Sequence, residues 1–199
     1  MRTVTATASA LEEVAELLIN GGVAVIPTDT VYGLAAHPDC PQAVERLYTI
    51  KGREAKKPIA LLAADVEAAR RFLGGELPPG AKDIASVHWP GALTLVLPVN
   101  KKGGGEVAGY EGLRVPDHDW TRRLLALCGG VLRVTSANLS GMRPATDVPA
   151  ALADVGLSAD MVVDDGVSPG GVASTVLKIE ASGQKVLLRD GPVKIVPSA

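Results

Sequence analysis

Apolar residues recur along the chain at two spacings, and the spacing changes at glycine or proline. Helical spacing predicts helices over residues 10–19, 41–50, 66–73, 119–127 and 147–155, with a further short helix after Gly80. Short apolar runs predict strands over residues 23–26, 59–63, 93–99, 131–134, 161–163, 174–179 and 185–188. Strands and helices alternate before a strand-rich end. The pattern therefore predicts an α/β fold, with an open, twisted, mixed sheet that carries helices on its faces.

Capping residues mark where several of these helices begin. Ser9 and Glu12 form a capping box for the first helix, and Asp65 precedes the helix over 66–73. Asp117 or Asp119 caps the helix that runs to residue 127.

Composition limits the class of protein. The 199 residues, 47% of them hydrophobic, are expected to form a single domain over 1–199. A net charge of −2 and 3% aromatic residues argue against a dedicated nucleic-acid module. Cys40 and Cys128 are far apart, which indicates neither a zinc site nor a disulfide scaffold. Without an apolar leader or a membrane-spanning run, the chain is expected to be cytoplasmic and not membrane-bound.

Polar side chains follow the apolar strand 23–26 directly. Thr28, Asp29 and Thr30 lie where the strand ends, and ligands of open α/β sheets bind beyond the carboxyl ends of strands. The alternative is an ordinary turn in which Thr28 and Asp29 bond their own backbone.

The densest positive charge lies in residues 51–57, just after the helix over 41–50. Lys51, Arg53 and Lys57 belong to this run and could hold a polyphosphate, since arginine offers a planar fork and lysine a point charge. The alternative is a solvated loop, but Gly52 indicates that the backbone bends here. Lys51 and Arg53 are predicted to be surface groups of a cavity.

A second polar cluster, residues 135–141, follows the strand 131–134 and contains Ser136 and Asn138. It could instead form a capped turn. Arg114, Ser174 and Arg189 each lie at a predicted strand boundary. Together these groups indicate an anionic ligand held by many neutral donors and a few cations. The sequence has no P-loop, no His-Glu-x-x-His and no Gly-x-Ser-x-Gly motif, and its three histidines are too scattered to suggest a metal site.

Eight ordered motifs between about residue 10 and residue 195 resemble the YrdC/Sua5 family of threonylcarbamoyl-AMP synthases. They are Pro27-Thr28-Asp29-Thr30-Val31-Tyr32-Gly33-Leu34, Lys51-Gly52-Arg53, Lys57-Pro58, Trp89-Pro90-Gly91-Ala92-Leu93-Thr94, Arg114-Val115-Pro116, Ser136-Ala137-Asn138-Leu139-Ser140-Gly141, Ser174-Thr175-Val176 and Arg189-Asp190-Gly191. The resemblance implies an open α/β fold around a deep, positively lined cavity. It also implies synthesis of threonylcarbamoyl-AMP and pyrophosphate from L-threonine, bicarbonate and ATP, the first step of N6-threonylcarbamoyladenosine formation at position 37 of certain tRNAs.

The resemblance also assigns roles to residues. Those that would hold threonine or its carbamate are Thr30, Arg114, Ser136 and Ser174. Those that would hold ATP are Lys51, Arg53, Lys57, Asn138, Thr146 and Arg189, with Lys51 and Arg53 the catalytic pair. A carbamate oxygen would attack the α-phosphorus in line, with Mg²⁺ neutralising the leaving pyrophosphate and no metal held by the protein itself. The adenylate would pass to a tRNA threonylcarbamoyl transferase, with weak or no direct tRNA binding.

Two departures from the family pattern shape these expectations. The chain ends soon after Gly191, so the short form without the C-terminal Sua5 domain is expected. Leu62 stands where some long-form members carry a histidine near threonine. The alternative functions are a paralogue that acts on another carbamate and an RNA-binding module that uses the same cavity.

Overall fold

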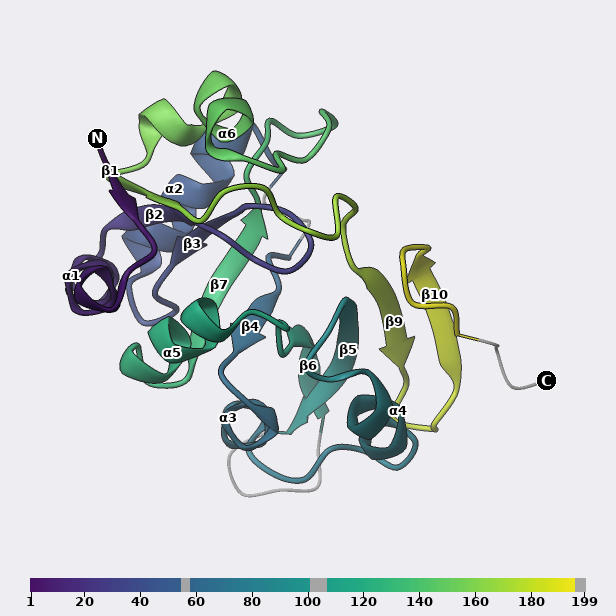
Figure 1. Cartoon of the computed structure of the whole chain (residues 1–199). Coiled ribbons are helices and arrows are strands. Elements are labelled where there is room, and N and C mark those ends of the chain that lie inside the picture. The colour runs from purple at the N-terminus through teal and green to yellow at the C-terminus, as the bar shows by residue number, and fades with distance from the viewer. Residues whose placement is uncertain (55–57, 101–106, 196–199) are drawn as a thin grey trace.

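The structure is a computed structural model that describes residues 1–54, 58–100 and 107–195. Its centre is a single open sheet of ten strands in the order β1-β8-β2-β3-β7-β4-β6-β5-β9-β10 (Figure 1). The strands are β1 (Arg2–Thr5), β2 (Val23–Ile26), β3 (Gly33–Ala36), β4 (Leu61–Ala63), β5 (Leu93–Asn100), β6 (Val107–Arg114), β7 (Val131–Ser136), β8 (Met161–Asp164), β9 (Thr175–Ile179) and β10 (Lys185–Arg189). Parallel and antiparallel pairs both occur, which confirms the predicted mixed α/β class.

Four helices cover one face of this sheet. They are α1 (Ala8–Ile19), α3 (Val66–Leu73), α4 (Ala81–His88) and α5 (Asp119–Leu127). Their apolar sides join one core with inward residues from most strands, among them Ile26, Leu61, Leu95 and Leu177. Because successive strand residues point to opposite faces, Leu93, Leu95 and Leu97 of β5 all enter this core and the residues between them face the other way.

The opposite face is covered along only part of its width. There α2 (Pro41–Lys51) and α6 (Val148–Asp154) pack on β2, β3 and β8 through a second core that contains Val25, Leu34 and Val162. This second core does not extend over β6, β5 and β9, and no described helix contributes to it there. The sheet therefore has a three-layered half and a half with one open face (Figure 1).

Three strands differ from the sequence prediction. The pattern did not predict β1, β3 or β6. The short β1 is polar and lies at the sheet edge, and β3 consists of the small residues Gly-Leu-Ala-Ala inside a motif assigned to the site. Gly109 and Gly112 interrupt the alternation of β6. None of the helices in the described ranges is long and apolar enough to cross a membrane.

Two predicted helix caps are wrong. Thr7, not Ser9, caps α1, where its hydroxyl accepts a hydrogen bond from the Ala10 backbone N–H at 3.3 Å. The cap of α5 is the His118 ring, whose Nδ1 accepts from the Thr121 backbone N–H, and neither Asp117 nor Asp119 holds that position. Asp65 caps α3 as predicted, through a 2.7 Å bond from the Ala68 backbone N–H.

Asp160 links α2 to the start of β2. Its carboxylate accepts two hydrogen bonds from Arg46, at 2.8 and 3.0 Å, and one from the Val23 backbone N–H at 2.7 Å. The Arg46 hydrogen bond is the main cause that lowers the pKa of Asp160 below its ordinary value of 3.8. Since a lowered carboxylate pKa stabilises the folded state above the unfolded pKa, this contribution is lost as the pH falls below about 4.

We expect Asp160→Asn to lower the free energy of unfolding by about 1 kcal/mol at pH 7, a modest value because both side chains are more than a third exposed. The deficit should shrink below about pH 4 as the wild-type carboxylate takes up its proton. Urea unfolding at pH 7 and pH 3 measures it, with Glu45→Gln on the exposed side of α2 as the control. An equal deficit at both pH values would contradict this role for the charge.

Candidate anion-binding cavity

A cavity of about 600 Å³ lies on the open face of the sheet. Three neighbouring strand segments supply every second residue to its floor, which consists of Tyr110, Gly112 and Arg114 from β6, Thr94 and Val96 from β5, and Ser174, Val176 and Lys178 in and just before β9. The pairing register places Val96 between Gly112 and Lys178, so these side chains form rows across the sheet. Leu95, Leu113 and Leu177, which lie between these residues, enter the opposite core. The alternation of the strands therefore creates the cavity floor and the core together.

The turn after β2 forms one wall. Thr28 donates its hydroxyl hydrogen to the Val31 carbonyl at 2.6 Å and accepts from the backbone N–H groups of Thr30 and Val31. The local turn considered from the sequence is therefore present. Because the single Thr28 proton is used, the 3.0 Å contact between the two hydroxyls has Thr30 as donor. Thr30 accepts from Arg114 Nη1 at 2.8 Å, so its hydroxyl can offer a ligand a lone pair and not a proton.

Arg114 is 5% exposed and lies against the same wall. Its guanidinium donates to Asp29 Oδ1 at 2.5 Å, to Thr30 Oγ1 at 2.8 Å and, through Nε, to the Gly91 carbonyl at 2.8 Å. Burial lowers the pKa of Arg114, while Asp29 opposes that shift. Three of its five N–H groups are used by these described partners, which leaves one on each terminal nitrogen to meet a ligand.

A second hydroxyl cluster lies across the floor. The hydroxyl groups of Ser174 and Thr94 form a hydrogen bond with an oxygen–oxygen distance of 2.8 Å, and both side chains are buried. Arg189 donates from Nε to the Ser174 carbonyl at 2.9 Å and from Nη2 to the Ser174 hydroxyl at 3.2 Å.

A register shift explains why Arg189 reaches this cluster. Leu187 pairs with Leu177 and Arg189 pairs with Val176, so Leu188 is an additional residue in β10. As a result both Leu188 and Arg189 line the cavity, whereas a regular strand would turn one of them away.

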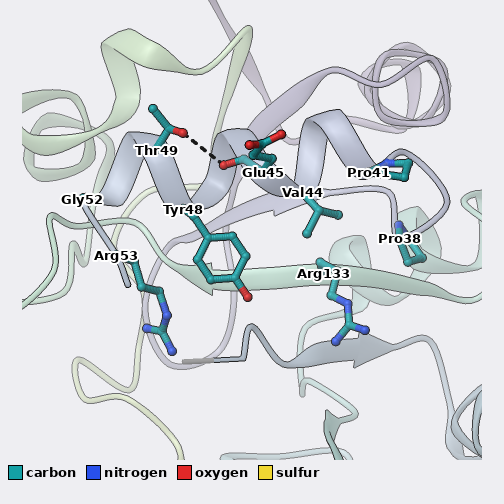
Figure 2. A pocket seen from close by; sticks show the side chains of 9 residues that line it. All are labelled: Pro38, Pro41, Val44, Glu45, Tyr48, Thr49, Gly52, Arg53 and Arg133. Carbon is teal, nitrogen blue, oxygen red and sulfur yellow. Dashed lines mark hydrogen bonds between the residues drawn. The ribbon is translucent and has the colours of Figure 1, made fainter. Parts of the chain in front are cut away.

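Arg53 enters the cavity from the end of α2. Gly52 caps this helix with φ +56, a left-handed conformation that glycine adopts without strain, and so turns the chain toward the sheet. Arg53 donates to the Pro58 carbonyl at 3.1 Å and lines the cavity. Figure 2 shows it leaving the helix beside Tyr48, where it also borders an outer groove of about 670 Å³ that extends to Arg133.

Three predicted ligand residues do not line this cavity. Lys51 is 2% exposed, so the prediction that it is a surface group is wrong. Asn138 is 5% exposed and bonds within its own loop. Thr146 is half-buried behind the wall, where its carbonyl accepts from the Ser168 backbone N–H. Lys57, another predicted ATP-binding residue, lies outside the described residues.

The structure brings the other predicted site residues together in one cavity. Ser136 joins Thr30, Arg53, Arg114, Ser174 and Arg189 in the lining, although these residues come from six separate parts of the chain. The sequence interpretation missed Tyr110 and Lys178, whose ammonium lies 4.1 Å from the Tyr110 ring centre and is paired with Glu180. Counting back in twos from Arg114 through Gly112 would have placed Tyr110 on the floor.

The electrostatics of the cavity favour an anion. Burial, followed by the charges of Arg114 and Arg53, lowers the pKa of Arg189. The cations therefore repel one another, and a bound anion would relieve that repulsion. The described lining contains no carboxylate, and no group of three His, Cys, Asp or Glu suited to a metal occurs in the described ranges. The described lining therefore offers Mg²⁺ no carboxylate ligand.

The fold and site define an α/β protein with an arginine-lined cavity on the open face of a mixed sheet. A family model described as "Telomere recombination", for Sua5, YciO and YrdC proteins, matches residues 16–191. The chain belongs to this Sua5/YciO/YrdC family.

Two relatives that share the name threonylcarbamoyl-AMP synthase align with most of this chain. The chain is 36% identical over 187 residues to a threonylcarbamoyl-AMP synthase of Bacillus subtilis, an alignment that covers 92% of this chain and 54% of the relative. It is 32% identical over 182 residues to one from Idiomarina loihiensis, covering 89% and 97%. The structure of Pyrococcus abyssi Sua5 complexed with L-threonine superimposes with a TM-score of 0.84 at 30% identity, covering 96% of this chain and 57% of that one. The chain thus spans little more than half the length of the first and third of these proteins.

Proposed function

We propose that this chain is a threonylcarbamoyl-AMP synthase, a nucleotidyltransferase that makes L-threonylcarbamoyladenylate and pyrophosphate from L-threonine, bicarbonate and ATP. The observation that carries the proposal is the convergence of three arginines with the hydroxyl side chains of Thr30, Ser136 and Ser174 on one cavity of about 600 Å³. Guanidinium groups suit phosphates and a carboxylate, and the hydroxyls suit a small polar amino acid. The names of the relatives and the L-threonine complex of the Pyrococcus protein support this assignment.

The two substrates would use different parts of the lining. Arg53 and Arg189 would hold the phosphates of ATP, together with Lys57 from outside the described residues. On the other wall, Arg114 would hold the threonine carboxylate through its two remaining N–H groups. Thr30 would accept a hydrogen bond from the threonine amine or hydroxyl. Ser136 and Ser174 would line the same threonine-binding part of the cavity.

Catalysis on these groups is chiefly positioning and charge stabilisation. The threonine amine and bicarbonate combine to a carbamate with loss of water. One carbamate oxygen then forms a bond to the α-phosphorus as the bond to the pyrophosphate oxygen breaks. Arg53 and Arg189 would stabilise the charge that develops on the phosphates, and Mg²⁺ carried by the triphosphate would help neutralise the leaving pyrophosphate.

The product fixes the next reaction. A threonylcarbamoyl-adenylate is a mixed anhydride that transfers its acyl group to a nucleophile, so an acyltransferase must consume it. We propose that this consumer is a cytoplasmic tRNA threonylcarbamoyl transferase. Direct tRNA binding by this chain would be weak, because its net charge is −2.

Omitting each substrate in turn tests the proposed function. Pyrophosphate release from the purified chain should require L-threonine, bicarbonate and ATP together, and a mass spectrum should show the threonylcarbamoyl-adenylate. Release that does not depend on threonine would indicate a paralogue acting on another carbamate. Tight RNA binding with no release under any condition would favour the RNA-binding alternative.

A further inference from the structure

Lys51 is buried behind the cavity wall and bonded to the polar loop that follows β7. Its ammonium donates to the Ser136 carbonyl at 2.5 Å, to the Asn138 carbonyl at 2.6 Å and to Asn138 Oδ1 at 3.2 Å. The Lys51 carbonyl in turn accepts from the Ser140 backbone N–H at 2.9 Å. An ammonium has three N–H donors, and all three have acceptors in this loop.

Asn138 completes the arrangement from the other side. Its Oδ1 accepts from Lys51, and its Nδ2 donates to the carbonyls of Leu139 and Met142, both at 2.7 Å. Every polar atom of this side chain therefore bonds within the loop or to Lys51.

Two of the sequence motifs therefore each place one residue in the wall and another in the cavity lining. In Lys51-Gly52-Arg53 the first residue points into the wall and the last lines the cavity. In Ser136-Ala137-Asn138 the first lines the cavity and the last points into the wall. The two inward members bond each other, and the two outward members line the cavity.

We propose that Lys51 and Asn138 are positioning residues that form an internal clamp, and that Arg53 and Ser136 are the members of these motifs that contact the substrate. The proposal rests on the proposed function for the identity of that substrate. The clamp turns the carbonyls of Ser136 and Asn138 onto the ammonium, whereas carbonyl oxygens pointing into the cavity would repel a phosphate. It also fixes the end of α2 to the loop, so that the positions of Arg53 and Ser136 are set together.

Unfolding of the unliganded protein separates a clamp from a direct phosphate ligand. Lys51→Met should lower the melting temperature by roughly 4–12 °C, because it removes three hydrogen bonds and leaves the Ser136 carbonyl with only the Asn138 backbone N–H as a donor. Asn138→Ala should lower the melting temperature by roughly 2–6 °C. The double variant should melt less than about 2 °C below Lys51→Met, because both substitutions disrupt the same clamp. Lys82→Met, an exposed lysine of α4, is the control.

The cavity-facing members should behave in the opposite way. Arg53→Ala and Ser136→Ala should melt within about 2 °C of wild type without ligand, yet lose the upward shift that ATP gives the wild-type protein. Should Lys51→Met fail to fold, Asn138→Ala still decides, because it keeps the ammonium and its two backbone acceptors.

A pH profile adds a signature that a merely structural contact would not give. Burial, then the charge of Arg53, lowers the pKa of Lys51 to about 8, and Asp154 opposes the shift. The threonine-dependent kcat/KM should therefore fall above about pH 8 in the wild type, as the ammonium loses a donor and its charge, and Lys51→Met should lack this limb. Because the folded pKa lies below the ordinary 10.5, wild-type stability relative to Lys51→Met should rise between about pH 8 and 10.5.

A wild-type melting temperature for unliganded Lys51→Met, combined with lost ATP binding, would overturn the proposal and make Lys51 a direct ligand. Additive losses in the double variant would also overturn it. The melting experiments need no substrate, so failure of the proposed synthase activity and failure of the clamp remain distinguishable.

Discussion

Arg53→Ala should slow threonine-dependent pyrophosphate release by roughly 10²–10³-fold, the usual effect of losing one group that stabilises transition-state charge. Arg53 lines the cavity directly after the left-handed Gly52, and its charge helps to lower the pKa of Arg189. Removing it would therefore take away a proposed phosphate ligand and relax the repulsion among the remaining cations. Steady-state kinetics at saturating threonine and bicarbonate, with ATP varied, measure the loss.

Arg123→Ala is the matched control, because Arg123 is an exposed arginine on α5, in the helix layer on the opposite face of the sheet. It should retain the wild-type rate. Arg53→Lys should recover only part of the loss, since an ammonium cannot present the planar fork of a guanidinium. Arg53→Ala with at least half the wild-type rate would remove this residue from the phosphate site.

The sequence predicted the elements whose hydrophobic pattern is regular. The strand over 23–26 and the helices that begin at Pro41 and Val66 follow from apolar spacing and a helix-starting or capping residue, and the structure confirms them. The pattern failed at β6, where Gly109, Glu111 and Gly112 break the alternation. Glycine is accepted there because Gly112 faces the cavity, where a Cβ would meet that of Ala60 at 3.1 Å. The glycine that fits the cavity therefore weakens the strand pattern on which the sequence prediction depends.

The site was predictable where a polar residue lies at a strand boundary. Arg114 and Ser136 end β6 and β7, Ser174 directly precedes β9, and the structure brings all three to one cavity. Tyr110 and Lys178 were missed because they lie inside strands, where a polar or aromatic residue usually indicates an exposed face. Their role depends on which face the helices leave open, and that is a property of the whole sheet.

Residue type alone could not separate Lys51 from Arg53. Both are cations in one short motif, and a basic run gives no sign of which member points inward. The distinction follows from the end of α2, where Lys51 is still helical and packs against the loop, while Gly52 redirects the next residue. A contact between residues 87 positions apart determines it, and local sequence carries no record of that contact.

Amino-acid selectivity should be graded, with threonine fastest, serine about 10–200-fold slower and valine slower by roughly 10⁴-fold in kcat/KM. Serine lacks one methyl, and a missing methyl in a pocket is worth only about 1–3 kcal/mol. Valine keeps the shape of threonine but lacks its hydroxyl. The lining would then leave polar groups unpaired, because Thr30 offers a lone pair and the buried Ser174 hydroxyl lies in a bonded cluster with Thr94 and Arg189.

Pyrophosphate release with each amino acid at saturating ATP and bicarbonate measures this order. Ser174→Ala is the informative variant, since it removes one hydroxyl from the floor without touching the Thr30 and Arg114 wall. It should slow threonine more than valine and so narrow their ratio by about tenfold or more. Shape alone cannot exclude valine, so equal turnover of valine and threonine by the wild-type protein would show that the hydroxyls of this cavity do not select the substrate.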